Sequence, residues 1–94
     1  MASRELERMH NAILDHRYTL TEYAVQEMAE DNLDVLDVES AILTGDIDQV
    51  LTMDPRGTRY VVIGKATDQE TPVGVVVRFV EQDQLLILTV YEMK

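Results

Sequence analysis

The sequence predicts a single α+β domain in which two or three N-terminal helices pack on one face of a four-stranded antiparallel sheet. Apolar residues recur at helical spacing in the first half of the chain, and the pattern becomes strand-like from Ile47 onward. The connections between the expected strands are short enough for a β-meander. The length of 94 residues corresponds to one domain, residues 1–94.

The first expected helix covers residues 3–16. Ser3 can serve as its N-cap, because a serine hydroxyl accepts a hydrogen bond from the first helical turn. The inward-facing stripe consists of Leu6, Met9, Ile13 and Leu14. The segment Tyr18–Leu20 is expected to be a short extended link to the second helix.

The second expected helix covers about residues 22–31, with Thr19 or Thr21 as its N-cap and Asn32 as a left-handed C-terminal cap. The third covers Asp34–Gly45, and an acidic first turn favours it through the helix dipole. The inward residues of these two helices are Leu20, Ala24, Val25 and Met28, followed by Val35, Val38, Ala41 and Ile42.

Four strands are expected after Gly45. They are Ile47–Met53, Thr58–Ala66, Pro72–Val80 and Leu85–Tyr91. The first is the most polar and is therefore expected at an edge of the sheet. The sequence Asp54-Pro55-Arg56-Gly57 predicts a turn, because Pro stands at its second position and Gly at its fourth.

The last two strands are apolar at both parities, which is typical of a sheet covered on both faces. The expected helices can cover only one face, unless the first helix crosses to the other. We therefore expect an uncovered apolar face that binds a second copy or an antitoxin-like protein. The candidate partner-binding residues are Val73, Val75, Val77 and Phe79.

The charge of the chain argues against a nucleic-acid partner. The net charge is −10, and residues 1–54 hold thirteen acidic and three basic residues. An acidic half of this kind repels nucleic acid phosphates, so RNA is disfavoured as a ligand. The charged N-terminus and the absence of an apolar run of about 20 residues predict a soluble cytoplasmic protein that does not enter a membrane.

No cofactor or metal is expected. The chain contains no cysteine, and therefore neither disulfides nor a thiolate zinc site are indicated. His10 and His16 are six residues apart on the first helix, which places them on opposite faces and prevents them from sharing a metal.

Arg78 is unusual because it stands within the most apolar strand. Its guanidinium must reach solvent, a carboxylate or an anionic ligand. A structural pair with an acid such as Glu92 is the simpler interpretation, and an anion or RNA site is the alternative. Arg59 and Lys65, on the preceding strand, share the face of Arg78 if the register allows it.

Over about residues 18–92 the chain resembles a small bacterial family with a domain of unknown function. The matching segments are Tyr18–Ala24, Asp37–Ile47, Tyr60–Gly64 and Leu86–Glu92. The most specific are Glu39–Gly45 and Ile87–Glu92. The family is similar to BrnT and MqsR toxins and hence to the RelE/ParE-like fold, and its members are often encoded beside a zinc-finger antitoxin. The resemblance implies an mRNA-cleaving or translation-inhibiting toxin that a partner protein neutralises.

The chain departs from the family pattern at two histidines. Tyr23 stands where the second helix of the family usually begins with His, and Gly74 lies near the position of the other His. The family also often has a basic residue near Glu27. Related toxins use Arg, Lys and Tyr to stabilise a phosphorane and move protons. The candidate catalytic residues are accordingly Arg59, Lys65, Arg78 and Tyr91.

Three functions are compatible with these observations. The preferred one is a protein-interaction module of toxin-like fold with weak or lost catalysis, because it explains the doubly apolar sheet, the missing histidines and the acidity together. The second is an active ribonuclease toxin neutralised by a zinc-finger antitoxin. The third is an acidic nucleic-acid mimic that occupies a basic protein groove through the surface of residues 22–54.

Overall fold

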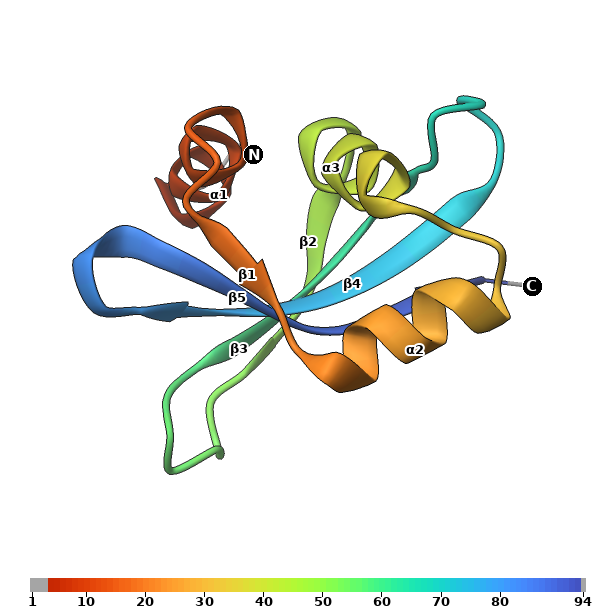
Figure 1. Cartoon of the computed structure of the whole chain (residues 1–94). Helices are drawn as coiled ribbons and strands as arrows, with labels where there is room; N and C mark the ends of the chain where they lie inside the picture. Colours follow the sequence, from red (N-terminus) through yellow and green to blue (C-terminus); the bar gives the residue numbers. More distant parts are fainter. Residues whose placement is uncertain (1–3, 94) are drawn as a thin grey trace.

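The computed structural model describes residues 4–93 and shows three helices and a five-stranded mixed sheet (Figure 1). The elements are α1 (Arg4–Leu14), β1 (Tyr18–Leu20), α2 (Glu22–Glu30), α3 (Val35–Thr44), β2 (Asp46–Leu51), β3 (Arg59–Lys65), β4 (Pro72–Val80), the short 3₁₀ helix η1 (Glu81–Asp83) and β5 (Gln84–Glu92). The strand order in the sheet is β1-β5-β4-β3-β2. Ser3, the expected N-cap of the first helix, lies outside the described residues.

The sheet contains the predicted meander and one further strand. β2, β3, β4 and β5 pair antiparallel in chain order, and β2 is an edge strand as predicted. The segment Tyr18–Leu20, expected to be a short extended link, is extended and forms the strand β1, which pairs in parallel with β5. Three residues are too few to show an alternating apolar pattern, so this pairing could not be predicted from the sequence.

Side-chain caps fix the starts of α2 and α3. Thr21 is the N-cap of α2 and accepts a hydrogen bond from the Ala24 amide. Asp34 and Asp37 form a capping box at the start of α3, in which each carboxylate accepts from the other residue's backbone N–H. Asn32 adopts the expected left-handed conformation with φ 57°. Among residues 4–93, no helix combines the length and apolarity needed to cross a membrane.

Residues of all three helices share one core with alternating residues of the sheet. The core consists of Leu6, Met9, Ala12, Ile13, Ala24, Met28, Val38, Ala41, Ile42, Val62, Ala66, Val73, Val75, Val77, Leu85, Ile87 and Val90. Figure 1 shows α1, α3 and α2 arranged around the twisted sheet. Because α1 joins the same core as the other helices, it does not cross to the second face.

Backbone contact between α3 and β3 holds the helix layer close to the sheet. A Cβ atom on Gly64 would lie 1.9 Å from the carbonyl oxygen of Ala41, so only glycine fits there. Two side chains of α3 also bond the last residue of β3. Ser40 Oγ donates to the carbonyl of Lys65 at 2.8 Å, and Thr44 Oγ1 accepts from its amide at 2.9 Å.

Helix α2 covers part of the β5 edge that the short strand β1 leaves open. Thr21 Oγ1 donates to the carbonyl of Leu88 at 3.1 Å. The carboxylate of Glu27 accepts from the Val90 amide at 3.1 Å, and that of Asp31 from the Glu92 amide at 2.9 Å. Side chains of α2 and of its two capping residues thus take the place of a neighbouring strand.

Candidate functional site

The face of the sheet that points away from the helices is apolar over its middle. We call it the uncovered face. Its apolar residues include Leu51, Val61, Ile63, Val76, Leu86 and Tyr91. The alternation of side chains along each strand places them there, because the opposite parity fills the core. Val61 is buried without belonging to the helix-bearing core, and the ring of Tyr91 lies where a Cβ on Gly74 would be.

Three arginines surround one carboxylate at one end of the uncovered face. We call Asp54, Arg56, Arg59 and Arg78 the arginine cluster. Arg59 is the first residue of β3 and Arg78 lies in β4. The two are close because Arg59 precedes Tyr60, Arg78 follows Val77, and Tyr60 pairs with Val77. The other two belong to the turn predicted at residues 54–57, which the Gly57 amide closes by donating to the Asp54 carbonyl at 3.0 Å.

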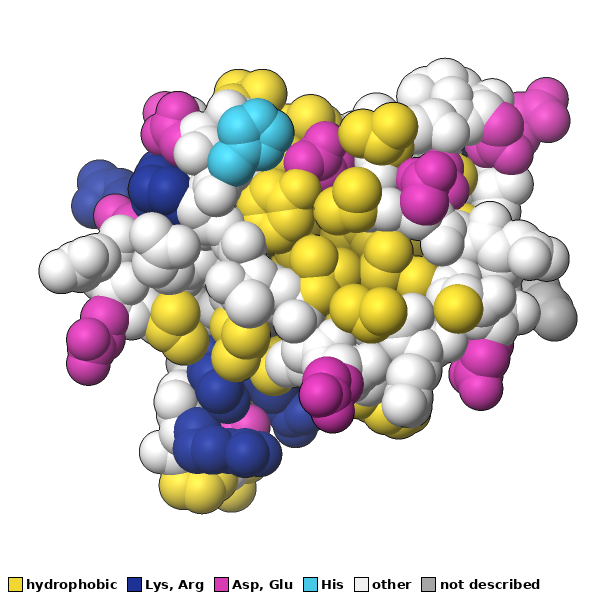
Figure 2. Space-filling view, in the orientation of Figure 1, with side chains coloured by type: hydrophobic (Ala, Val, Ile, Leu, Met, Phe, Trp, Pro, Cys, Tyr) yellow, Lys and Arg dark blue, Asp and Glu magenta, His cyan; other side chains and the backbone are white. Residues whose placement is uncertain are grey.

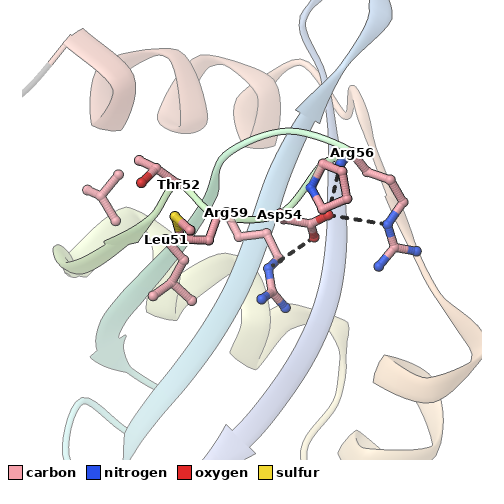
Figure 3. A pocket seen from close by; sticks show the side chains of 8 residues that line it. Leu51, Thr52, Asp54, Arg56 and Arg59 are labelled. Atoms are coloured by element: carbon pink, nitrogen blue, oxygen red, sulfur yellow. Dashed lines mark hydrogen bonds and ion pairs between the residues drawn. The ribbon is translucent and has the colours of Figure 1, made fainter.

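The carboxylate of Asp54 lies between the arginine side chains (Figure 3). Its Oδ1 accepts from the backbone amide of Arg56 at 2.9 Å and from Nε of the same residue at 3.4 Å. Its Oδ2 lies 3.3 Å from Nε of Arg59 and 3.8 Å from Nη1 of Arg78. The Asp54 side chain is 5% exposed, whereas exposure of the arginine side chains rises from 12% at Arg78 through 40% at Arg59 to 77% at Arg56.

The cluster carries a net positive charge on an acidic protein. The backbone amide of Arg56 and the guanidinium groups of Arg56 and Arg59 hold the pKa of Asp54 below its usual value. The carboxylate is therefore ionised at neutral pH, and three cations face one anion. Figure 2 shows the largest group of Lys and Arg side chains at the bottom of the molecule and a smaller group at its left edge, with Asp and Glu distributed over much of the remaining surface.

The positive charge of the cluster is incompletely matched by acceptors. The Nε atoms of Arg59 and Arg78 are buried and have no hydrogen-bond acceptor among the described residues. Nε of Arg59 is near Asp54 Oδ2, but the geometry is not that of a hydrogen bond. Two surface depressions flank the cluster. One of about 520 Å³ is bordered by Arg56 and Arg59, and one of about 640 Å³ by Arg56 and Arg78.

The four candidate catalytic residues lie at opposite ends of the sheet. Arg59 and Arg78 come together at the cluster. Lys65 ends β3 and is paired with Pro72, and Tyr91 is paired with Gly74. The six-residue separation of Arg59 and Lys65 along one strand corresponds to roughly 20 Å. The structure therefore brings together one pair of candidates and leaves the other pair at the far end.

The candidate partner-binding residues do not lie on the uncovered face. Val73, Val75 and Val77 are 0% exposed in the core beneath the helices. Phe79 is partly buried against the same core, and the guanidinium of Arg8 lies 4.0 Å from its ring centroid. The sequence could not choose between the two parities because both are apolar. The opposite parity of β4, with Val76 and Arg78, is the one on the uncovered face.

Arg78 does lie near an acid, as the simpler interpretation expected, but the acid is not Glu92. Glu92 pairs with Val73, at the other end of β4, and its amide is bonded to Asp31. The carboxylate near Arg78 belongs to Asp54, in a turn that sequence reasoning treated only as a chain reversal. One signal in the sequence could have indicated Asp54: its turn contains both an acid and an arginine, and the strands next to the turn also contain arginines.

A second group of polar side chains lies on the helix side. The hydroxyl of Tyr18 donates to the carboxylate of Glu39, and Nδ1 of His16 lies 3.9 Å from the same carboxylate. Burial, together with the hydrogen bond and the charge of Glu39, raises the pKa of Tyr18 to about 12. His16 is 79% exposed. This group ties β1 to α3, and its distances do not define a further ligand site.

Comparison with known proteins gives a family and no function. The model of a family described as Domain of unknown function (DUF4258) matches residues 20–92, which is most of the chain. The chain belongs to this family. Neither the curated proteins nor the solved structures gave a match.

Proposed function

We propose that this member of the DUF4258 family is a protein-interaction module that binds a partner protein through the uncovered face. The observation that carries the proposal is the composition of that face. Apolar residues of four strands adjoin a cluster with excess positive charge, and the helices pack on the opposite side. Apolar surface beside a few arginines is typical of protein interfaces, in which arginine is enriched.

The charge of the cluster favours a partner with acidic side chains. The chain as a whole is strongly negative, so the cluster is a local exception to its repulsion of anions. A partner that places a carboxylate there gains attraction at the cluster, and the neighbouring apolar residues contribute burial. The apolar burial provides affinity, and the charge pairing fixes the position of the partner on the uncovered face.

A second copy of the chain fits this face less well. If two faces stacked antiparallel, the exposed Lys65 of each copy would approach the arginines of the other. If they stacked parallel, arginine would approach arginine. Like charges across an interface oppose association. We therefore favour an acidic partner of different sequence over a homodimer.

The experiment compares one charge substitution on each side of the sheet. Val76→Asp places a charge in the middle of the uncovered face. Leu36→Asp places the same charge on α3, where Leu36 is 58% exposed on the helix side. Proteins captured from the native host are identified and purified, and their affinity for each folded variant is measured by calorimetry. Selective loss of binding in Val76→Asp supports the proposal, and equal binding by both variants contradicts it.

A ribonuclease toxin is the second candidate function. It is supported by the proximity of Arg59 and Arg78, which could hold a phosphate between them. The separation of Lys65 and Tyr91 from this pair argues against the proposed four-residue catalytic set. Growth inhibition by the wild-type chain in its host, lost in Arg59→Ala with the fold intact, would favour this function over binding alone.

The relationship to BrnT and MqsR toxins and to the RelE/ParE-like fold belongs to the same proposal. It is supported by helices that precede an antiparallel meander, and by the sequence segments that first indicated the resemblance. The nucleic-acid mimic is the remaining alternative. It predicts that charge reversal within residues 22–54 impairs partner binding, whereas our proposal assigns binding to the uncovered face.

A further inference from the structure

We propose that the arginine cluster is a receptor for a carboxylate on an extended acidic segment of the partner, and that Asp54 occupies this receptor in the free protein. This inference rests on the proposed function and adds the chemical group that the partner supplies. It also assigns Asp54 the role of an internal competitor.

The distances show that Asp54 does not saturate the three arginines. Strong guanidinium–carboxylate pairs have N···O distances of about 2.7–2.9 Å and are often bidentate. The side-chain nitrogens that approach Asp54 are at 3.4, 3.3 and 3.8 Å. Each guanidinium has five N–H donors, whereas one carboxylate offers two oxygens. A second carboxylate, or one that replaces Asp54 at shorter distance, can engage donors that Asp54 leaves without a close acceptor.

The surroundings of the cluster favour a peptide over a nucleic acid. Across the sheet, Arg59 is paired with Leu51 and Arg78 with Leu86, so each arginine has an aliphatic neighbour. An extended peptide with alternating side chains can place an acid over the arginines and apolar groups over the aliphatic positions. Single-stranded nucleic acid binds instead by stacking its bases on aromatic side chains along a basic groove. Tyr91, the aromatic residue of the uncovered face, lies at the end away from the cluster.

The turn that carries Asp54 makes this carboxylate a suitable competitor. Oδ1 is already engaged by the backbone amide of Arg56 within the turn, which leaves Oδ2 for Arg59 and Arg78. Asn at this position retains an Oδ1 acceptor for the turn and removes the negative charge from the cluster. Asp54→Asn should therefore keep the turn and free the receptor, with a lower Tm because the carboxylate near Arg78 is lost. Asp48→Asn is a matched control, because Asp48 is an exposed acid of β2 in the same hairpin.

The test uses a synthetic octapeptide of alternating valine and glutamate, with a valine–glutamine peptide and a single-stranded RNA octamer as comparison probes. Binding to the whole chain is followed by NMR through the Nε–Hε signals of Arg59 and Arg78 and through backbone amides. We expect the acidic peptide to shift these signals and the glutamine peptide to leave them unchanged. Asp54→Asn should bind the acidic peptide roughly three- to tenfold more tightly, and Asp48→Asn with wild-type affinity. Arg56→Gln, a change at the most exposed arginine, should bind more weakly.

Three outcomes would contradict the proposal that the arginine cluster is a carboxylate receptor. They are equal affinity of wild type and Asp54→Asn, equal binding of the two peptides, and tighter binding of RNA than of the acidic peptide at the arginine signals. Failure of the receptor can be distinguished from failure of the proposed function. If Val76→Asp abolishes partner binding while Asp54→Asn has no effect, the uncovered face binds a partner without a carboxylate receptor. If neither substitution matters, both proposals are wrong.

Discussion

Arg59 and Arg78, on neighbouring strands, both approach the same oxygen of Asp54, with distances of 3.3 and 3.8 Å from Oδ2. Two guanidinium groups side by side on a sheet repel each other, and the shared carboxylate offsets this repulsion. The positions of the arginines follow from strand register, but the position of the carboxylate follows from the turn at residues 54–57. The stability of this end of the sheet therefore depends on one loop residue.

The first prediction concerns removal of that carboxylate. Asp54→Ala should lower the Tm by several degrees, because Arg78, with a side chain 12% exposed, loses the carboxylate that partly compensates its charge. Asp48→Ala should leave the Tm nearly unchanged. Thermal unfolding is followed by circular dichroism at low ionic strength. If the two variants unfold at the same temperature, Asp54 contributes nothing to this end of the sheet.

The second prediction concerns acid stability and Asp37. Hydrogen bonds from the backbone amide and hydroxyl of Thr67, and from the amide of Asp34, hold the pKa of Asp37 below its usual value. A folded-state pKa below the unfolded one gives stability that is present above the unfolded value and is lost as pH falls through the folded value. The stability that Asp37 contributes is therefore lost in the pH range below about 4.

Asp37→Asn should therefore make stability less dependent on pH in that window and lower stability at neutral pH. Urea unfolding at pH 7 and at pH 3 measures both effects. Asp15→Asn, at an acid whose side chain is 63% exposed, serves as the control. If Asp37→Asn loses as much unfolding free energy between pH 7 and pH 3 as the wild type does, Asp37 is not the source of the acid dependence of stability.

The third prediction concerns alkaline stability and Tyr18. Its pKa is raised to about 12 by burial and by Glu39, whereas the unfolded phenol titrates near its ordinary value of 10.0. The folded state thus holds the proton more tightly, and stability present below pH 10.0 is lost as pH rises toward 12. Tyr18→Phe should reduce this alkaline loss of stability. Ultraviolet titration should show one of the four tyrosines ionising later than the others, and the late phase should be absent from Tyr18→Phe.

The fourth prediction compares two glycines with different obstacles. A Cβ on Gly64 would meet the backbone oxygen of Ala41, whereas a Cβ on Gly74 would meet the ring of Tyr91 at 2.2 Å. Gly64→Ala should cost about 3 kcal/mol or more in the free energy of unfolding, because backbone must move. Gly74→Ala should also destabilise the protein, but a second substitution can relieve that clash.

Tyr91→Leu is expected to restore part of the stability lost in Gly74→Ala, because it removes the ring. It should give no such rescue in Gly64→Ala. Denaturant unfolding of the single and double variants measures the coupling between the two positions. Additive effects of Gly74→Ala and Tyr91→Leu would show that the ring is not the obstacle.

The sequence was sufficient for the elements whose signals are local. The helix caps at Thr21 and Asp34, the turn at residues 54–57 and the edge position of β2 all follow from residue types at short spacing. The strand β1 was missed because its evidence is a pairing with β5, more than 60 residues away in the chain. Such a contact leaves no pattern in three residues.

Only part of the candidate site was predicted, because some of its residues meet through contacts that are distant in the chain. Arg59 and Arg78 were identified because arginine is unusual in apolar strands, and the structure brings them together. The outward parity of β4 could not be chosen, because Val75 and Val76 are equally apolar and only the packing of the helices distinguishes them. Asp54 was not assigned to the site because its approach to Arg78 depends on the path of a loop.

The two bonds from α2 to the edge of β5 limit how this sheet can be extended. With Glu27 and Asp31 bonded to the amides of Val90 and Glu92, another strand cannot pair there unless α2 moves. The other edge, β2, remains, and its pairing with β3 is irregular between Ile47 and Gln49. On the opposite side the outermost strand is β1, and its three residues are too few to extend the sheet, so two copies joined through β2 would offer no long open edge to a third. Strand pairing between copies should therefore stop at a closed pair and not propagate into a fibre.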